Sequence, residues 1–166
     1  MNTQSDLTLP IPLSEALTPL LQVLPLTAAM PALVPSSPAE AEALEAAEEV
    51  LRQPMISGNP ALQAGVWLYV DELERSHALS QGIDDPTGSF WHAIMHRREG
   101  DFSNAKYWLR QAGSHPVWAS LPGYEPYGFV DEVARRHREN PAELVEMQRA
   151  EWVHLMRFGH DDVGGL

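Results

Sequence analysis

The chain contains no cysteine. Disulfide bridges, thiolate metal ligands and a cysteine nucleophile are therefore excluded, and a reducing, cytoplasmic location is expected. Apolar runs of about 20 residues, the length that spans a bilayer, are also missing, so no membrane-crossing helix is expected. Residues 7–34 are fairly apolar, but no basic residue precedes them and prolines interrupt them. They are thus a poor match to a secretory signal.

Positive charge is scarce in the first third of the chain. No Lys or Arg occurs before Arg52, whereas seven acidic residues do. Residues 1–51 carry a charge of -7 and the remainder -5, within a net charge of -12. Proteins that bind nucleic acids need a basic face toward the phosphates, so this composition argues against such a partner. The length of 166 residues is that of one ordinary domain with a hydrophobic core.

Prolines are concentrated near the N-terminus, where residues 1–38 hold seven of the fourteen. Proline removes a backbone donor and disfavours helix in the residue before it, so this segment cannot form one long helix. We predict a Pro-rich arm at 1–36, a helical domain at 37–160 and a tail at 161–166. The arm is rich in leucine, which favours packing on the body or on a neighbouring subunit over partial disorder.

Helix start signals recur along the rest of the chain. A residue of type Ser, Asn or Asp before proline caps a helix, because its side chain accepts a free N–H and proline suits the first turn. These pairs are Ser37-Pro38, Asn59-Pro60, Asp85-Pro86 and Asn140-Pro141. The predicted helices run from 37 to before 54, 59 to about 79, 85 to about 99, 101 to 113, about 128 to 139, and 140 to about 158. Period-2 apolar runs are missing, so the predicted fold class is all-α, a bundle of about six helices in antiparallel hairpins.

Residues 90–112 resemble a single tetratricopeptide repeat. The stretch Gly100-Asp101-Phe102, followed by Ala105 and Ala112, matches the second helix of that family, and Ala93 matches the small residue of the first. The resemblance implies a helical hairpin whose helices approach closely through these alanines. A second copy at the family's period of about 34 residues is not found, so a solenoid is not expected. The whole segment also resembles stretches of uncharacterised bacterial proteins, which implies no function.

His92 and His96 are the strongest candidate site residues. At positions i and i+4 of one helix they lie on the same face, and Glu99 continues that face. The spacing suits two imidazoles on one metal ion, although the Glu of an HExxH motif is missing. A helical wheel places both histidines opposite the apolar face, toward solvent, whereas the repeat-like register turns them toward the next helix. The alternatives are hydrogen-bonded structural histidines, a small-molecule or catalytic pocket using His92, His96 and Glu99, and a metal site at His92 and His96.

The helix before this hairpin holds further polar residues near its apolar stripe. His77 is predicted to be a core histidine that Glu74 orients, and Asp71 is predicted to be solvated. Arg98 falls within the apolar stripe of its own helix, so a carboxylate partner from Glu72 or Glu74 is expected. The alternative is a guanidinium that lies over the apolar surface with its charged end in water.

The connection at residues 114–127 is long for a helical bundle and rich in aromatic side chains. Loops of this length often cover a ligand. Such a lid would bring His115, Trp118 and Tyr124 over the two histidines and complete a ligand-binding pocket. The other interpretation is that these aromatics close one end of the core.

Two functions from different classes follow. The first, which the sequence favours, is a non-catalytic module without a cofactor that binds a partner protein or its own copy. The second is a small-molecule-binding or metal-dependent enzyme with a His92/His96 pocket and a divalent metal as cofactor. Neither version involves nucleic acid or a membrane.

Overall fold

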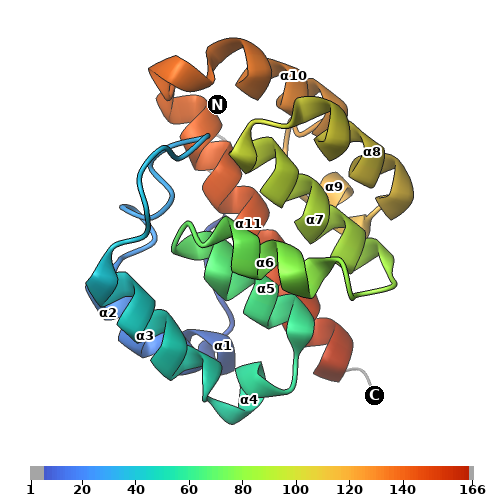
Figure 1. Ribbon diagram of the computed structural model, residues 1–166. Coiled ribbons are helices and arrows are strands. Elements are labelled where there is room, and N and C mark those ends of the chain that lie inside the picture. The colour runs from blue at the N-terminus through green and yellow to red at the C-terminus, as the bar shows by residue number, and fades with distance from the viewer. Residues whose placement is uncertain (1–5, 165–166) are drawn as a thin grey trace.

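The structure, a computed structural model, describes residues 6–164 (Figure 1). Within this range the chain forms α-helices and one short 3-10 helix and no strand, which confirms the all-α prediction. The helices are α1 (Ile11–Ala16), α2 (Thr18–Val23), α3 (Ala41–Leu51), α4 (Pro54–Ser57), α5 (Pro60–Tyr69), α6 (Leu73–Ser80), α7 (Pro86–Glu99), α8 (Phe102–Ala112), α9 (Pro116–Ser120), α10 (Pro126–Arg136), η1 (His137–Glu139) and α11 (Ala142–Gly164).

The described residues thus hold eleven α-helices where about six were predicted. Four of the additional ones are short: α1 and α2 in the arm, α4 beginning at Pro54, and α9 in the long connection. The fifth comes from a break in the helix predicted for 59–79. There Asp71 takes a left-handed conformation with φ 65°, which ends α5 and starts α6 in a new direction. At Ser37 the predicted cap is not used, since α3 begins four residues later with Glu40 at its N-cap and no side-chain cap.

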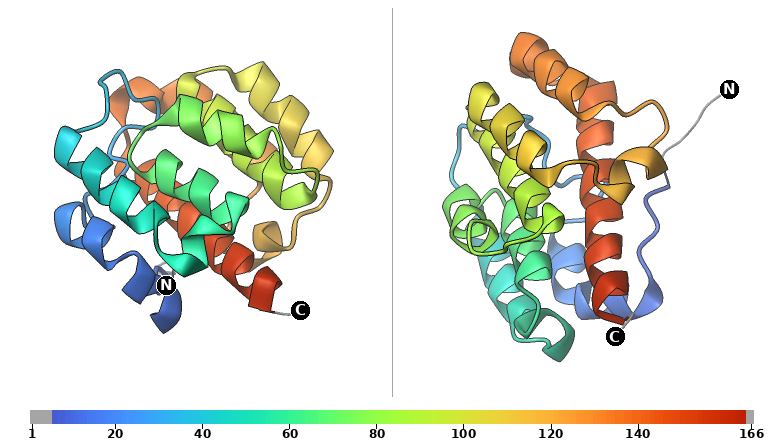
Figure 2. Two further views of the ribbon diagram at one scale, coloured as in Figure 1. Left: turned by 60° about the horizontal axis from the view of Figure 1, so that its bottom comes forward. Right: turned by 90° about the vertical axis from the view of Figure 1, so that its right-hand side faces the viewer.

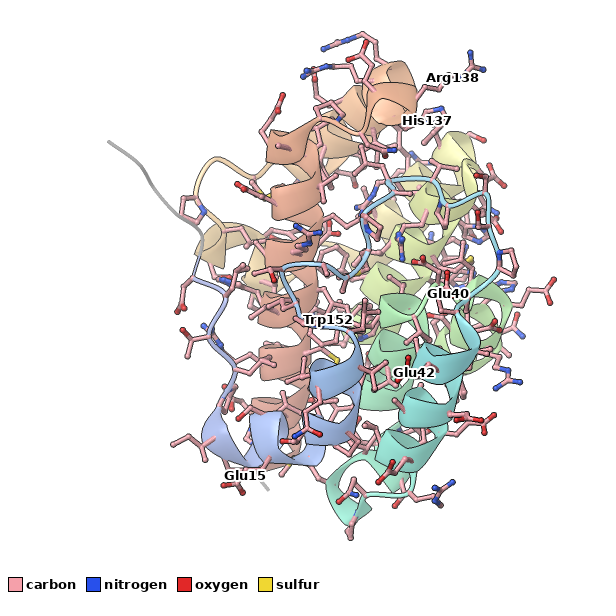
Figure 3. The ribbon with its side chains drawn as sticks, turned by 90° about the vertical axis from the view of Figure 1, so that its left-hand side faces the viewer. Glu15, Glu40, Glu42, His137, Arg138 and Trp152 are labelled. Atoms are coloured by element: carbon pink, nitrogen blue, oxygen red, sulfur yellow. The ribbon has the colours of Figure 1, made fainter. Side chains whose placement is uncertain are left out.

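Helices α5 and α11 form the centre of the molecule (Figures 1 and 2). Helix α11 runs past α5 and α9, while α5 also contacts α3, α4, α6 and α7. The indole of Trp152 on α11 points into the interior (Figure 3), where its Nε1 donates to the carbonyl oxygen of Gly65 at 2.8 Å. Glycine at position 65 lets α5 closely approach the Trp91 ring of α7 and the Met156 side chain of α11.

The arm packs on the body of its own chain. Leu13, Leu17 and Leu20 are fully buried and belong to the same core as α5 and α11. After α2 the arm has few backbone partners of its own, so side chains of the body donate to its carbonyl groups. Gln148 Nε2 donates to Met30 O at 3.2 Å, and Arg149 Nε donates to Ala29 O at 2.9 Å.

Helices α7 and α8 pack along each other more extensively than any other pair. Gly100 ends α7 in the left-handed conformation at φ 86°, and the Asp101 side chain caps α8 by accepting from Asn104 N at 3.3 Å. Ala93, Ala105 and Ala112 are all buried. The predicted turn between two packed helices is therefore present and the three alanines are buried, whereas the resemblance to a tetratricopeptide repeat stays a prediction.

None of the helices in residues 6–164 is both long enough and apolar enough to cross a membrane.

The contact at Gly65 yields a stability prediction. A Cβ on Gly65 would overlap Met156 Sδ and lie 2.9 Å from Trp91 Cζ2. We expect Gly65→Ala to lower the free energy of unfolding by about 1–2 kcal/mol, because overpacking outweighs the gain in helix propensity. Gly58→Ala is the matched control, since nothing lies within 4 Å of its Cβ position. Chemical denaturation gives the unfolding midpoint of each variant. A midpoint of Gly65→Ala equal to that of Gly58→Ala would contradict the close packing at Gly65.

Candidate functional site

Helix α7 presents His92 and His96 to α8. The two residues are only 3% and 6% exposed. The His92 ring stacks on Trp108 of α8, with centroids 3.9 Å apart, and on His96, with centroids 4.7 Å apart. The register that turns these histidines toward the next helix is therefore the one found.

A third histidine, His77 of α6, completes the cluster. Its half-buried ring lies edge-on to both others, with centroids 4.7 Å from His92 and 5.4 Å from His96. One ring nitrogen from each of the three lies within 4.8 Å of the others. His77 was predicted to be a core histidine oriented by Glu74, and its place in this group was missed. The direction of α6, and with it the position of His77, depends on the left-handed conformation of Asp71. The presence of an Asp in the sequence does not by itself predict that conformation.

Hydrogen bonds set the tautomer of His96. Its Nδ1 lies 2.6 Å from Glu99 Oε1, and a carboxylate only accepts, so Nδ1 carries the hydrogen. The Nε2 atom then carries a lone pair, which accepts from the Asn104 Nδ2 amide at 3.2 Å. A carboxylate on the far nitrogen is the usual partner of a metal-binding histidine, because it orients the ring and raises its basicity. Glu99, predicted to continue the histidine face, thus contacts the cluster.

Unlike the nitrogens of His96, the Nδ1 of His92 is buried and has no hydrogen-bond partner. Burial, together with the neighbouring His96 and His77, lowers the pKa of His92 to about 4. The ring is thus neutral at pH 7, the protonation state in which imidazole binds a metal. A buried nitrogen without a partner is costly, and a bound cation would satisfy it.

The donor set fits a transition-metal ion. Imidazole suits Zn²⁺, whose Zn–N bonds of about 2.0–2.1 Å place the ligand atoms roughly 3.4 Å apart. The present separations of up to 4.8 Å are wider than this, so the three side chains would have to move closer together to hold an ion. A second group that meets the same criterion, formed by His96, Glu99 and Asp101, shares His96 with the first. Carboxylate oxygens therefore lie beside His96.

The predicted lid residues lie elsewhere. His115 caps α9, accepting from Val117 N at Nδ1 (3.1 Å), and its Nε2 lies 3.0 Å from Thr87 Oγ1. Trp118 packs edge-on against Phe90, with centroids 5.9 Å apart. These contacts are with α9 and the N-terminal half of α7 rather than with the histidine cluster. Their assignment as ligand-binding residues therefore stays a prediction, and their observed contacts close one end of the core.

Tyr124, the third aromatic of that set, belongs to a buried ionic network. Its hydroxyl donates to Glu151 Oε2 at 2.5 Å. Glu151 is fully buried and binds the Arg97 guanidinium through both oxygens, at 2.8 and 2.9 Å. Burial, and then the charge of Glu151, raise the pKa of Tyr124 well above its usual range, so the hydroxyl stays a donor.

Arg98 has a different partner from the one predicted. Its Nη2 binds Asp71 Oδ1 at 2.6 Å, and the fully buried guanidinium also donates to Leu68 O and Ala32 O. The expected partners, Glu72 and Glu74, and the solvated position expected for Asp71 are therefore wrong. The left-handed conformation of Asp71 turns its carboxylate toward α7, an effect that helical spacing cannot predict.

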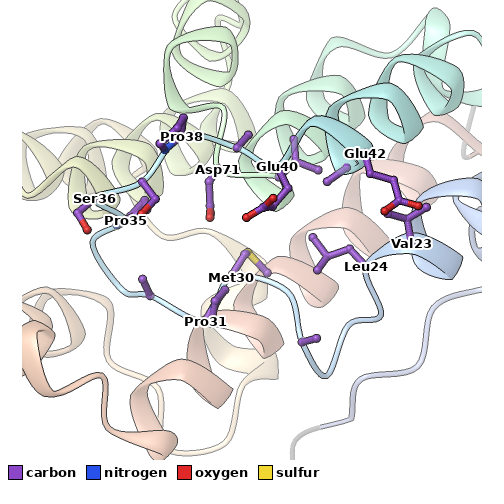
Figure 4. Close-up of a pocket in the computed structure, with 16 residues that line it drawn as sticks. Val23, Leu24, Met30, Pro31, Pro35, Ser36, Pro38, Glu40, Glu42 and Asp71 are labelled. Atoms are coloured by element: carbon purple, nitrogen blue, oxygen red, sulfur yellow. The ribbon is translucent and has the colours of Figure 1, made fainter.

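A pocket of about 410 Å³ lies between the arm and the start of α3 (Figure 4). Its lining is mostly apolar, with Leu24 and Met30 on the arm side and Glu40 and Asp71 opposite. Met30 and Asp71 both have positive φ. The Asp71 carboxylate of this pocket is already paired with Arg98, whereas His92 Nδ1 has no hydrogen-bond partner. The histidine cluster is therefore the stronger candidate for a ligand site.

Comparison with protein-family models, with curated proteins and with solved structures finds no match for the chain.

The buried ion pair yields a prediction for Glu151→Gln. Loss of the negative charge leaves the Arg97 guanidinium, 2% exposed, without its counterion. We expect the free energy of unfolding to fall by about 3 kcal/mol. Glu132→Gln removes a carboxylate from exposed ion pairs with Arg135 and Arg136 and should change it by less than about 0.5 kcal/mol. Urea titration compares the two variants, and an equally small loss for both would refute the network's role.

The state of His115 yields a pH prediction. Burial lowers its pKa from 6.5 to about 4, so the folded protein holds the ring neutral where the unfolded chain takes a proton. The stability contributed by His115 is present above pH 6.5 and is lost as pH falls toward 4. His115→Asn keeps the α9 cap and removes the titrating ring. Its unfolding free energy should fall less steeply over this pH range than that of the parent. Parallel slopes in denaturation series would contradict the assignment.

Proposed function

We propose that this helical protein binds one divalent transition-metal ion, zinc being the best match, through His77, His92 and His96. The observation that carries the proposal is the buried His92 Nδ1, which has no hydrogen-bond partner and lies within a group of three imidazoles. Such a nitrogen on a neutral ring is a ready metal ligand.

The neighbouring residues support the same ion. Glu99 fixes the His96 tautomer with Nε2 unprotonated, and it brings negative charge to offset the cation. Three imidazoles leave a position for a fourth ligand on a tetrahedral ion, which a water molecule would fill. The bound ion would join α6 to α7, and this would hold the direction of the chain after the break at Asp71.

The role favoured by the sequence, a protein-interaction or self-association module, has less support. The large apolar side chains exposed in the described part of the chain are Ile11, Val23 and Tyr107, which belong to three different helices. The leucines of the arm, which prompted the idea of a neighbouring subunit, contact the body of their own chain. That role and a cytoplasmic location stay predictions.

Metal titration of the full chain tests the proposal. We expect one equivalent of Zn²⁺ to bind and to raise the free energy of unfolding, by about 2.7 kcal/mol when free Zn²⁺ is 100 times the Kd. Co²⁺ should give the visible absorption bands of a tetrahedral site. Absence of both the bands and stoichiometric binding would overturn the proposal.

Variants separate a metal site from structural histidines. His92→Phe should abolish the Co²⁺ bands without destabilising the metal-free protein, because the ring can still stack on Trp108 and the orphan nitrogen is gone. His77→Ala should weaken binding strongly, since it removes one of three ligands. His137→Asn, in η1 and away from the cluster, is the control and should bind like the parent. Destabilisation of the metal-free protein by His92→Phe with unchanged Zn²⁺ binding would show a packing role instead.

A further inference from the structure

Three groups that are distant in the sequence meet beside α9. The Ser120 hydroxyl at the end of α9 lies 2.9 Å from His154 Nδ1 on α11. The other ring nitrogen, His154 Nε2, lies 3.2 Å from the main-chain carbonyl oxygen of Asp6 in the arm. A hydroxyl, an imidazole and an acceptor behind the imidazole form the arrangement of a nucleophile, its general base and the group that orients the base.

The hydrogen bonds determine which nitrogen is the base. A carbonyl oxygen only accepts, so His154 Nε2 must carry the hydrogen that points at Asp6 O. Nδ1 therefore has the lone pair, and that lone pair faces the Ser120 hydroxyl. Burial, and then the charge of Arg157, lower the pKa of His154, so the ring is neutral and able to accept a proton near pH 7.

The pair borders an open hollow of about 480 Å³ on the surface. Ser120 is exposed there, whereas His154 is 8% exposed beneath it. Val117 and Phe158 give the hollow apolar walls, while Asp161 and the ion pair of Arg157 with Asp6 make up its charged part. An acyl group of a small ester fits apolar walls of this kind.

We propose that Ser120 and His154 form an acyl-transfer site that hydrolyses small carboxylic esters. Ser120 Oγ attacks the ester carbonyl carbon while its proton passes to His154 Nδ1. The bond from carbon to the leaving oxygen breaks, and the Nδ1 proton goes to that oxygen to release the alcohol. Water then attacks the acyl-serine, gives one proton to Nδ1 and forms the carboxylic acid. The Nδ1 proton returns to Ser120 Oγ as it leaves.

The Ser120 hydroxyl also lies 2.7 Å from the carbonyl oxygen of Val117. Its single proton points either to that carbonyl or to His154 Nδ1, and the second orientation is the reactive one. The role of Ser120 as a simple helix-end donor is therefore the alternative that an experiment has to separate from nucleophilic reactivity.

Covalent labelling of the full chain makes this separation. We expect a fluorophosphonate probe to give an adduct that tandem mass spectrometry locates at Ser120. The p-nitrophenyl ester of acetate should acylate the same residue with a burst of p-nitrophenol. Ser120→Ala should lose both signals. Ser114→Ala, which removes an exposed hydroxyl just before α9, is the control and should keep them.

The dependence on His154 completes the test. His154→Gln can still donate to the Asp6 carbonyl but offers no base, so labelling should slow by about 100-fold while the unfolding midpoint stays close to that of the parent. A Ser120 adduct that forms equally fast in His154→Gln would overturn the base assignment. Labelling at Ser120 no faster than at Ser114 would show that Ser120 only caps the helix, whatever the outcome of metal titration.

Discussion

Two adjacent arginines at the end of α7 set the arrangement of everything around them. Arg97 and Arg98 are 2% and 0% exposed, and a buried guanidinium without a counterion is among the most costly groups a fold can contain. Because their side chains leave the helix in different directions, they need partners on two sides. Arg97 meets Glu151 of α11, and Arg98 meets Asp71 between α5 and α6. The arm, α6 and α11 are thus all positioned relative to one helix.

This constraint also explains the histidine cluster. Asp71 reaches Arg98 only because its backbone is left-handed, and the same change of direction carries α6 across α7. His77 is on α6, one turn after Leu73, so it arrives beside His92 and His96 as a consequence. The ion pair and the cluster therefore depend on the same break in the chain.

Local signals predicted the helix ends well and the path between them less well. Asn59 and Asp85 accept from Leu62 N and Gly88 N as caps before proline should, and Gly100 ends α7 as a left-handed glycine. These effects involve neighbouring residues only. The break at Asp71 could not be predicted, because a distant arginine stabilises it. Asn140 illustrates the same limit, since its side-chain oxygen accepts from Leu33 N, 107 residues away.

The candidate sites divide in the same way. His92, His96 and Glu99 share one helix, so spacing alone placed them together. His77 and Trp108 required knowledge of how α6 and α8 lie against α7, and the apolar stripes do not specify that. Ser120 and His154 are 34 residues apart on helices that α10 and η1 separate in the chain. The third member of the group is a backbone carbonyl, which no residue type in the sequence marks.

The hydrogen bonds from α11 to the arm have a consequence for how the chain is made in a cell. The arm leaves the ribosome well before its hydrogen-bond donors, because Gln148 and Arg149 follow Met30 and Ala29 by 118 and 120 residues. Until then its leucines have no complete surface to cover them. The nascent polypeptide should therefore remain incompletely folded, and able to bind chaperones, until α11 emerges from the exit tunnel.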